Sequence, residues 1–401
     1  IRVLPSVSDI AKGKIEIADL KAVKIEDLLR RDIRDPDKEL LQKNITDKSV
    51  LVTGAGGSIG SELCRQIIQL EPSRLVLFDI SEASLYLIEQ ELREYDSNVS
   101  ILAIIGNVTR RSRLDYILNT YEINTVYHAA AYKHVPLVEK NTIPGIRCNI
   151  FGTLTLIQAA MNASVDNFVF ISTDKAVRPT NIMGATKRFA ELILQALAEN
   201  DDSETVGNKK TKICIVRFGN VLGSSGSVVP LFRKQIKDGG PVTVTDPKVI
   251  RYFMTIGEAT ELVIQAGSIS NGGEVFLLDM GNPISILSLA KEMIRLSGKT
   301  IKDNSNNDDS IEIIFTGLRD GEKLYEELLI GDSVDKTIHE HIMCANEEKL
   351  TSKEVTDYIN KLKLLRSDNT LSDIQKVLYE SVEGYEPSSS KNVIDIKVKN
   401  K

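Results

Sequence analysis

The segment Ser172-Thr173-Asp174-Lys175 places hydroxyl, carboxyl and amine groups within four consecutive residues. Asp174 and Lys175 together supply one potential acid and one potential base, the pair that a reaction moving protons requires. The segment directly follows an apolar run, and ligands bind at the carboxyl ends of the strands in doubly wound sheets. We therefore expect these residues to form part of an active site. The competing interpretation is that Asp174 only caps a helix.

A second segment, Met183-Gly184-Ala185-Thr186-Lys187, lacks a side chain that would usually complete such a site. Many dehydrogenases with a doubly wound sheet carry Tyr-x-x-x-Lys at this place, and the lysine helps the phenol to act as a base. None of the 11 tyrosines of the chain has a lysine four positions later. Met183 occupies the tyrosine position, and a thioether exchanges no proton at neutral pH. Other residues must therefore transfer the protons.

A glycine-rich turn, Thr53-Gly54-Ala55-Gly56-Gly57-Ser58-Ile59-Gly60, predicts a dinucleotide site. It stands between an apolar strand and a helical pattern, which gives the glycine spacing its weight. Gly54 permits the tight turn, Gly57 lets the backbone approach a pyrophosphate, and Gly60 lets the helix pack on the strand. The helix N-terminus offers free N–H groups to the phosphates. A tight turn with no ligand is the alternative.

Asp79 ends the next apolar run, where a carboxylate accepts hydrogen bonds from the adenosine ribose. After Asp79, the chain has no Lys or Arg before Arg93. A 2′-phosphate would therefore meet an uncompensated negative charge, and we expect NAD rather than NADP.

The elements that hold these residues alternate between apolar runs and helical patterns, which is typical of βαβ units. We expect an α/β fold with a doubly wound parallel sheet and a smaller C-terminal substrate-binding lobe. The expected strands are 49–53, 74–79, 100–105, 125–131, 168–172, 212–217 and 275–279.

Four regions are expected along the chain. They are an N-terminal arm (1–46), the dinucleotide-binding domain (47–220, with a strand returning near 275–279), a region that is mostly substrate-binding lobe (221–340), and a C-terminal helical segment with a polar tail (341–401). Helices are predicted at 352–365 and 372–379. Residues 298–310 are expected to form a mobile polar loop.

Composition excludes several classes of protein. The 401-residue chain has a formal net charge of -6, so it lacks the excess of cations that nucleic-acid binding needs. The four cysteines and four histidines show no zinc-ligand spacing, and we expect no bound metal. No run of about 18 apolar residues is present. The chain begins at Ile1, and we expect it to be a fragment of a longer protein.

Several motifs resemble the nucleotide-sugar dehydratases of the extended short-chain dehydrogenase/reductase superfamily. They are Val52-Thr53-Gly54, His128–Pro136, Ser172–Val177, Met183–Arg188, Arg217–Ser227, Arg251–Thr255 and Gly321–Glu327, and they span roughly residues 48–330. Methionine at the tyrosine position resembles the large, membrane-anchored UDP-N-acetylglucosamine 4,6-dehydratases among the polysaccharide biosynthesis proteins. The sequence departs from the pattern of this family at two positions. Asn107 stands where an Asp usually faces the adenine amino group, and Asp320 stands where Pro is usual. The Asn107 carbonyl could accept the same hydrogen bond.

The resemblance implies NAD, a UDP-N-acetylglucosamine substrate and a role for each site residue. Lys175 would remove the C5 proton, Asp174 would protonate the departing C6 hydroxyl, and Thr173 would hold the 4-hydroxyl. A lysine beside a positive nicotinamide and out of water can be neutral. The other cofactor residues would be Ser58, Ile59, Val108, Ala129, Ala130 and Lys187, and the substrate contacts Lys133, His134, Asn220, Arg217, Arg251 and Glu322.

A diphosphate would need cations to bind it, and Arg217, Arg251 and Lys323 could supply them. The alternative for each of these residues, and for Lys133, is an ordinary surface charge. His134 is more often structural.

The expected reaction retains the configuration at C5. A nucleotide-sugar epimerase and a cofactor-sensing regulator without activity are the competing functions. We further expect a homo-oligomer on the cytoplasmic face of the bacterial inner membrane, attached only through a region before Ile1.

Overall fold

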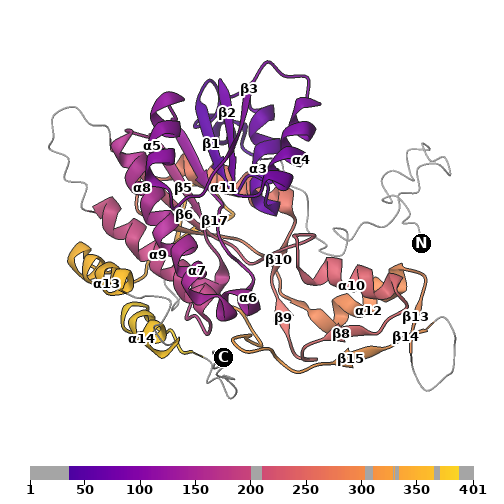
Figure 1. The fold of residues 1–401 in the computed structure, drawn as a ribbon. Helices are drawn as coiled ribbons and strands as arrows, with labels where there is room; N and C mark the ends of the chain where they lie inside the picture. The colour runs from indigo at the N-terminus through magenta and orange to yellow at the C-terminus, as the bar shows by residue number, and fades with distance from the viewer. Residues whose placement is uncertain are drawn as a thin grey trace, which may run out of the picture.

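The computed structural model describes residues 36–199, 210–302, 310–327, 329, 334–364 and 371–387. A nine-stranded sheet in the order β16-β17-β11-β6-β5-β4-β1-β2-β3 forms its centre (Figure 1). Seven neighbouring strands are parallel: β1 (Ser49–Thr53), β2 (Arg74–Asp79), β3 (Ser100–Ile105), β4 (Thr125–His128), β5 (Asn167–Ile171), β6 (Lys212–Arg217) and β11 (Val275–Leu278). The antiparallel strands β17 (Ile342–Ala345) and β16 (Val334–Lys336) extend one edge.

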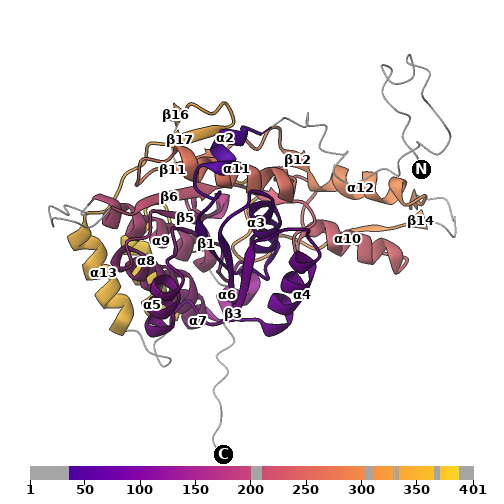
Figure 2. The ribbon, with the colours of Figure 1, turned by 90° about the horizontal axis from the view of Figure 1, so that it is seen from above.

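Helices cover both faces of the sheet, as Figure 2 shows from above. One face carries α2 (Lys38–Gln42), α3 (Ser58–Gln69), α4 (Glu82–Arg93) and α11 (Ile256–Ile269), and the other carries α5 (Arg111–Thr120), α8 (Thr153–Asn162) and α9 (Ile182–Glu199). The central parallel strands are buried on both sides, which explains their continuous apolar sequences, whereas the edge strand β3 is only partly buried. The order in which successive strands are added to the sheet reverses between β1 and β4, and such a switch point creates a ligand crevice. The predicted doubly wound fold is confirmed.

Short elements connect β4 to α8 beside this crevice. They are α6 (Val135–Lys140), α7 (Thr142–Ile146) and the π-helix η3 (Arg147–Gly152). The sequence predicted that β4 would reach residue 131, but it ends at His128. Ala129, Ala130 and Ala131 instead line a cavity at the carboxyl end of the sheet.

A second lobe lies to one side of the sheet around α10 (Val228–Lys237) and α12 (Ile286–Leu296). Its strand pairs are β7 (Asn220–Val221) with β10 (Phe253–Met254), β8 (Val242–Val244) with β15 (Ile313–Phe315), β9 (Ile250–Arg251) with β12 (Ile284–Ser285), and β13 (Thr300–Ile301) with β14 (Ser310–Ile311). β13 and β14 occupy the ends of the polar loop expected at 298–310, whose residues 303–309 lie outside the described ones. The lobe is discontinuous, because α11 returns to the main sheet.

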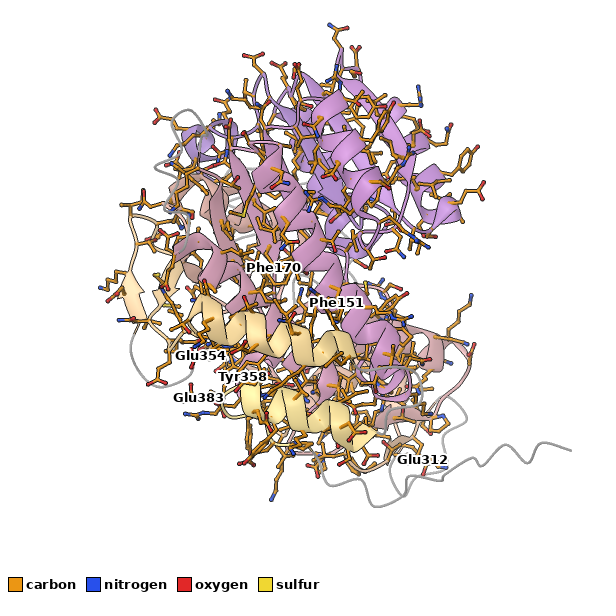
Figure 3. All side chains as sticks on the ribbon, turned by 60° about the vertical axis from the view of Figure 1, so that its left-hand side comes forward. Phe151, Phe170, Glu312, Glu354, Tyr358 and Glu383 are labelled. Carbon is orange, nitrogen blue, oxygen red and sulfur yellow. The ribbon has the colours of Figure 1, made fainter. Side chains whose placement is uncertain are left out.

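The C-terminal helices α13 (Ser352–Leu364) and α14 (Leu371–Ser381) lie beside α9 (Figures 1 and 3). Their buried residues pack on the face of α9 that points away from the sheet, so almost every residue of α9 is buried. The region 341–401 is therefore more than a helical segment, because it also contributes β17. The arm residues 1–35 and the tail residues 388–401 lie outside the described residues. None of the helices within the described ranges is long and apolar enough to cross a membrane.

Candidate active site

The glycine turn between β1 and α3 has the geometry that the sequence predicted. Gly54 has a φ of 69°, and a Cβ there would lie 2.7 Å from the backbone nitrogen of Ala130. A Cβ on Gly60 would collide with the Gly54 carbonyl. Gly57 caps α3 without a side-chain hydrogen bond to the helix. The first N–H groups of α3 therefore stay available to an anionic ligand.

Two cavities, of about 810 and 460 Å³, meet at this turn. The larger one extends past Phe78 and Asp79 to the loop after β3, and the smaller one extends to Lys133, His134 and Leu137. Together they are lined by every residue that we expected at the cofactor except Lys187, namely Gly54, Gly57, Ser58, Ile59, Gly60, Asp79, Asn107, Val108, Ala129 and Ala130.

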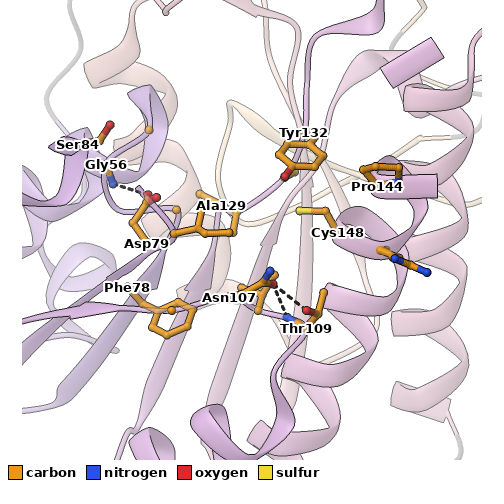
Figure 4. A pocket seen from close by; sticks show the side chains of 18 of the residues that line it. Gly56, Phe78, Asp79, Ser84, Asn107, Thr109, Ala129, Tyr132, Pro144 and Cys148 are labelled. Atoms are coloured by element: carbon orange, nitrogen blue, oxygen red, sulfur yellow. Dashed lines mark hydrogen bonds between the residues drawn. The ribbon is translucent and has the colours of Figure 1, made fainter. Parts of the chain in front are cut away.

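Asp79 is fixed at the end of β2 by two backbone donors. Its Oδ2 accepts from the N–H of Gly56 at 2.9 Å (Figure 4). Its Oδ1 accepts from the N–H of Ser81 at 2.8 Å. Each carboxylate oxygen can accept a further hydrogen bond. The carboxylate thus faces the cavity in a fixed position and can accept hydrogen bonds from a ribose diol.

Asn107 corrects one expectation. Its Oδ1 accepts from both the N–H and the hydroxyl of Thr109, each at 2.9 Å (Figure 4). The side-chain carbonyl that we expected to accept from an adenine amino group is therefore already used inside the loop. A backbone N–H can only donate, so the orientation of the amide is fixed by its partner.

The turn after β5 brings Thr173, Asp174 and Lys175 into one hydrogen-bonded group. The hydroxyl of Thr173 donates to Asp174 Oδ1 at 2.8 Å, and Lys175 Nζ donates to the same oxygen at 3.0 Å. Lys175 Nζ also lies 3.4 Å from the Oδ1 of Asn220. Asp174 is fully buried, and its Oδ2 has no hydrogen-bond partner among the described residues. Thr173 rather than Asp174 caps the short 3₁₀ helix here, so the helix-cap interpretation of Asp174 is wrong.

Glu326 is a member of this group that the sequence reasoning missed. Its Oε1 lies 3.8 Å from Lys175 Nζ and 3.9 Å from Arg251 Nε, and its side chain is 5% exposed. Burial and the nearby Asp174 raise the pKa of this carboxyl, although the cations of Lys175 and Arg251 oppose the shift. The sequence shows Glu326 as part of the Gly321–Glu327 motif. It does not predict the contact with Lys175, because that contact forms only when the second lobe packs against the turn after β5.

The protein by itself sets the pKa of the Lys175 side chain through three opposing effects. Burial alone would lower the pKa of its ammonium group, but the carboxylates of Asp174 and Glu326 raise it, and the net shift is upward. The protein by itself therefore favours the ammonium form. A neutral Lys175 requires that one of these two carboxyls be protonated or that a further positive charge be close.

The two expected residues of α9 lie beneath the turn. Met183 is 3% exposed and packs in the core, as a thioether can. Lys187 Nζ donates to the carbonyl of Ile171 at 2.6 Å and lies 3.8 Å from the centre of the Phe170 ring. Burial lowers its pKa to about 7. Lys187 is thus the lysine of the site that burial brings close to neutrality.

Arg217 does not contact an open site, which corrects our expectation that it binds substrate. It is fully buried, and its guanidinium donates to Glu191 and Glu347 at distances between 2.6 and 2.8 Å. Arg188 joins the same two carboxylates at 3.1 Å each. Ser172, which precedes the turn of Thr173, Asp174 and Lys175, donates its hydroxyl to Glu191. We call Arg188, Glu191, Arg217 and Glu347 the charge cage.

Arg251 and Glu322 also hold the protein together in this structure. The terminal nitrogens of Arg251 donate to the carbonyls of Ile250, Lys323 and Leu324 and to Glu322. Its Nε lies 3.9 Å from Glu326 Oε1, beyond hydrogen-bond distance, so the four N–H groups on the terminal nitrogens are used within the protein. Lys323 donates to the carbonyl of Val177 at 3.1 Å. Of the expected substrate contacts, Lys133 and His134 line the smaller cavity, and Asn220 lies beside Lys175.

Comparison with known proteins identifies the family. A family model described as "Polysaccharide biosynthesis protein" matches residues 50–347. The chain is 47% identical over 375 residues to the capsular polysaccharide biosynthesis protein CapD of Staphylococcus aureus, a match that covers 91% of this chain and 60% of CapD. It is 32% identical over 294 residues to a UDP-glucose 4-epimerase of Rickettsia rickettsii, covering 72% of this chain and 80% of the epimerase. The chain thus spans less than two thirds of the length of CapD.

A solved structure supports the same assignment. The X-ray structure of Pen from Bacillus thuringiensis is 33% identical in sequence and has a TM-score of 0.66, covering 80% of this chain and 99% of Pen. The predicted extended short-chain dehydrogenase/reductase fold and the predicted family are both confirmed. The chain belongs to the polysaccharide biosynthesis protein family.

Proposed function

We propose that the chain is an NAD-dependent, C5-retaining UDP-N-acetylglucosamine 4,6-dehydratase. The observation that carries this proposal is the hydrogen-bonded turn of Thr173, Asp174 and Lys175 above an α9 in which Met183 replaces the usual tyrosine. The turn offers an acid, a base and a hydroxyl, while no phenol is present at the tyrosine position. Such a site favours elimination of water.

The residues of the larger cavity fit NAD. Asp79 accepts hydrogen bonds from the ribose diol, and the N-terminus of α3 binds the pyrophosphate. Lys187 lies beneath the turn, where its ammonium group can hold the nicotinamide ribose. A bound NAD would supply the hydride acceptor for C4 of the sugar and the hydride donor for C6.

The hydrogen bond between Thr173 and Asp174 gives the 4-hydroxyl proton an acceptor. As C4 is oxidised, this proton passes to the Thr173 oxygen while the Thr173 proton passes to Asp174 Oδ1, 2.8 Å away. Asp174 is then neutral, and it protonates the C6 hydroxyl, which leaves as water. Asp174 ends the cycle ionised, as it began. The same proton therefore serves oxidation and elimination, and no tyrosine is required.

Protonation of Asp174 also prepares Lys175 to act. Asp174 is one of the two carboxylates that raise the Lys175 pKa, so neutralising Asp174 lowers that pKa at the moment when a base is needed. Lys175 then takes the C5 proton and returns it to the same face of the sugar. Retention at C5 follows, with UDP-2-acetamido-2,6-dideoxy-α-D-xylo-hexos-4-ulose as the product.

An epimerase is the second candidate, and the Rickettsia rickettsii relative named a UDP-glucose 4-epimerase favours it. An epimerase oxidises and reduces C4 without losing water, so it does not require an acid placed for C6. The fully buried Asp174, with an unpartnered Oδ2, favours the dehydratase. A regulator without activity would have no use for the hydrogen bonds of the turn.

One incubation tests both candidates. The protein is mixed with UDP-N-acetylglucosamine in D₂O, and the product is analysed by mass spectrometry and NMR. We expect loss of one water and the D-xylo configuration at C5, with deuterium at C5 only to the extent that the Lys175 amine exchanges its hydrogens with D₂O. A product of unchanged composition with inverted C4 would show an epimerase, and an L-arabino product would refute retention. Denatured protein should release NAD, and release of NADP would contradict the cofactor assignment.

A further inference from the structure

The Gly321–Glu327 segment of the second lobe is attached to the chain that follows Lys175. The Thr180 hydroxyl donates to the Gly321 carbonyl at 2.8 Å, and the Asn181 amide donates to the same carbonyl at 3.1 Å. A Cβ on Gly321 would lie 2.7 Å from the Cβ of Asn181, so the two stretches of chain touch directly. These contacts fix the carboxylates of the segment relative to Lys175.

Glu326 acts on Lys175 through its charge and not through a hydrogen bond. Its Oε1 lies 3.8 Å from Lys175 Nζ, and the two side chains are only 5% and 23% exposed. An opposite charge at this distance and burial favours the charged form of its partner. Arg251 Nε lies 3.9 Å from the same oxygen, and its cation favours the ionised form of Glu326.

The charges around Lys175 come from three parts of the chain. The charged groups that face it are Asp174 in its own turn, Glu326 on the second lobe and Arg251 on β9. Helix α9 packs beneath the turn, but its charged residues have other partners: Lys187 contacts the Ile171 carbonyl, and Arg188 and Glu191 belong to the charge cage. The two anions of the group are therefore Asp174 and Glu326.

We infer that Glu326 is a positioning residue whose carboxylate keeps the Lys175 amine strongly basic while Asp174 is protonated. In the proposed relay, Asp174 receives a proton during oxidation and loses its charge. Glu326 is then the anion that stabilises the proton that Lys175 takes from C5. Burial and the charge of Asp174 oppose the ionisation of Glu326, so protonation of Asp174 also strengthens that ionisation. The inference rests on the proposed function in making Lys175 the base.

The reaction of the Lys175 amine with acetic anhydride measures this effect without substrate, because only a neutral amine is acetylated. Acetylation of Lys175 is compared by mass spectrometry with that of the exposed Lys248 in the same protein at mildly alkaline pH. Glu326→Gln keeps the size of the side chain and removes its charge. We expect the ratio to rise about threefold or more, because loss of a nearby anion lowers the pKa of the ammonium group by about one or more, while a less basic amine reacts more slowly.

The control is Glu327→Gln, the same substitution at the next residue, whose carboxylate pairs with the exposed Arg178. It should leave the ratio unchanged. An equal ratio in Glu326→Gln and the wild type would overturn the inference. In the wild type alone, acetylation of Lys175 should rise about tenfold per pH unit up to about pH 10, the range in which a lysine stays protonated. A rate that levels off at lower pH would overturn the inference even if the variant does not fold.

The pH dependence of turnover connects this charge to catalysis. In Glu326→Gln, the acid limb of kcat for dehydration should move to lower pH by about one unit, because the amine loses its proton more readily. Above that limb kcat should be lower than in the wild type, because a less basic amine removes the C5 proton more slowly. A changed acetylation ratio with an unmoved acid limb would overturn the role of Glu326 in the reaction, together with Lys175 as the base. An unchanged ratio would overturn the charge effect itself and leave the proposed function standing.

Discussion

At the scale of single residues, Asp174 is the central group of the site. It receives the Thr173 hydroxyl and the Lys175 ammonium on one oxygen, and it is fully buried. Because the Thr173 hydroxyl donates directly to Asp174 Oδ1, a proton can pass to Asp174 along this hydrogen bond. The proposed relay uses this property, because Asp174 takes up a proton during oxidation and gives it away during elimination.

The relay predicts different losses for Asp174→Asn and Lys175→Met. Asp174→Asn removes the acceptor for the Thr173 proton, so we expect C4 oxidation itself to fall by at least about 100-fold. Lys175→Met keeps the acceptor, so transient NADH absorbance should appear in a single turnover without product. Thr173→Val should behave like Asp174→Asn. Strong NADH accumulation in Asp174→Asn would contradict the relay.

Lys187 has a predictable effect on stability. Its folded-state pKa is about 7, below the ordinary value of 10.5, so the unfolded chain binds more protons between these two values. Folding stability therefore rises with pH across that window, by roughly 1.4 kcal/mol per pH unit at most. Below pH 7 Lys187 is charged in the folded protein, so the burial of its ammonium group lowers the free energy of unfolding by its full amount.

Lys187→Met removes this dependence. Compared with the wild type, the variant should be relatively most stable at pH 6–7, and its advantage should shrink as the pH approaches about 10. Urea unfolding at several pH values measures the difference. The exposed Lys248→Met is the control and should show no such trend. A constant difference between Lys187→Met and wild type from pH 7 to 10 would show that Lys187 does not titrate in this way.

At the scale of elements, the charge cage joins three parts of the chain. Arg217 ends β6, Glu191 and Arg188 belong to α9, and Glu347 follows β17. The four charges cancel, and all four side chains are almost completely buried. Ser172 connects the cage to the catalytic turn. The cage thus fixes the ends of two strands relative to the helix that carries Lys187.

A substitution that breaks the charge cage should lower the free energy of unfolding more than one that breaks an exposed ion pair nearby. Glu347→Gln leaves Arg217 and Arg188 with an uncompensated buried charge, and we expect a loss of about 3–5 kcal/mol in the free energy of unfolding. Glu199→Gln makes the same substitution in the exposed pair with Lys349 and should cost at most about 1 kcal/mol. Chemical denaturation measures both. Equal losses would show that the cage is no stronger than a surface contact.

At the scale of the whole molecule, local patterns predicted the sheet but not the contacts between lobes. Apolar runs gave the parallel strands to within three residues at each end, because all of them except the edge strand β3 are buried on both faces. Nothing local distinguishes an arginine that binds phosphate from one that pairs inside the protein. Arg217 meets Glu347 and Lys175 meets Glu326 only after distant segments pack together. Charged residues in motifs therefore identified the site without revealing their partners.

The contact between the lobes predicts how the cofactor is retained. The loop Gly223–Ser227 of the second lobe reaches the phosphate-binding turn, where the N–H of Ser225 donates to the Ser58 hydroxyl at 3.0 Å. Ser225 also lines the larger cavity. Gly226 lies directly on the His134 ring. We therefore expect this loop to slow the release of NAD.

Gly226→Ala and Gly223→Ala form a matched pair for this expectation. Both glycines have a positive φ, 70° and 73°, so alanine strains the backbone equally at either position. A Cβ on Gly226 would collide with His134, whereas a Cβ on Gly223 would meet nothing within 4 Å. Only Gly226→Ala should displace the loop from Ser58, and we expect it to release NAD at least about tenfold faster, as measured by displacement with excess fluorescent NADH. Equal release rates for the two variants would mean that backbone strain, and not the contact with His134, sets the rate.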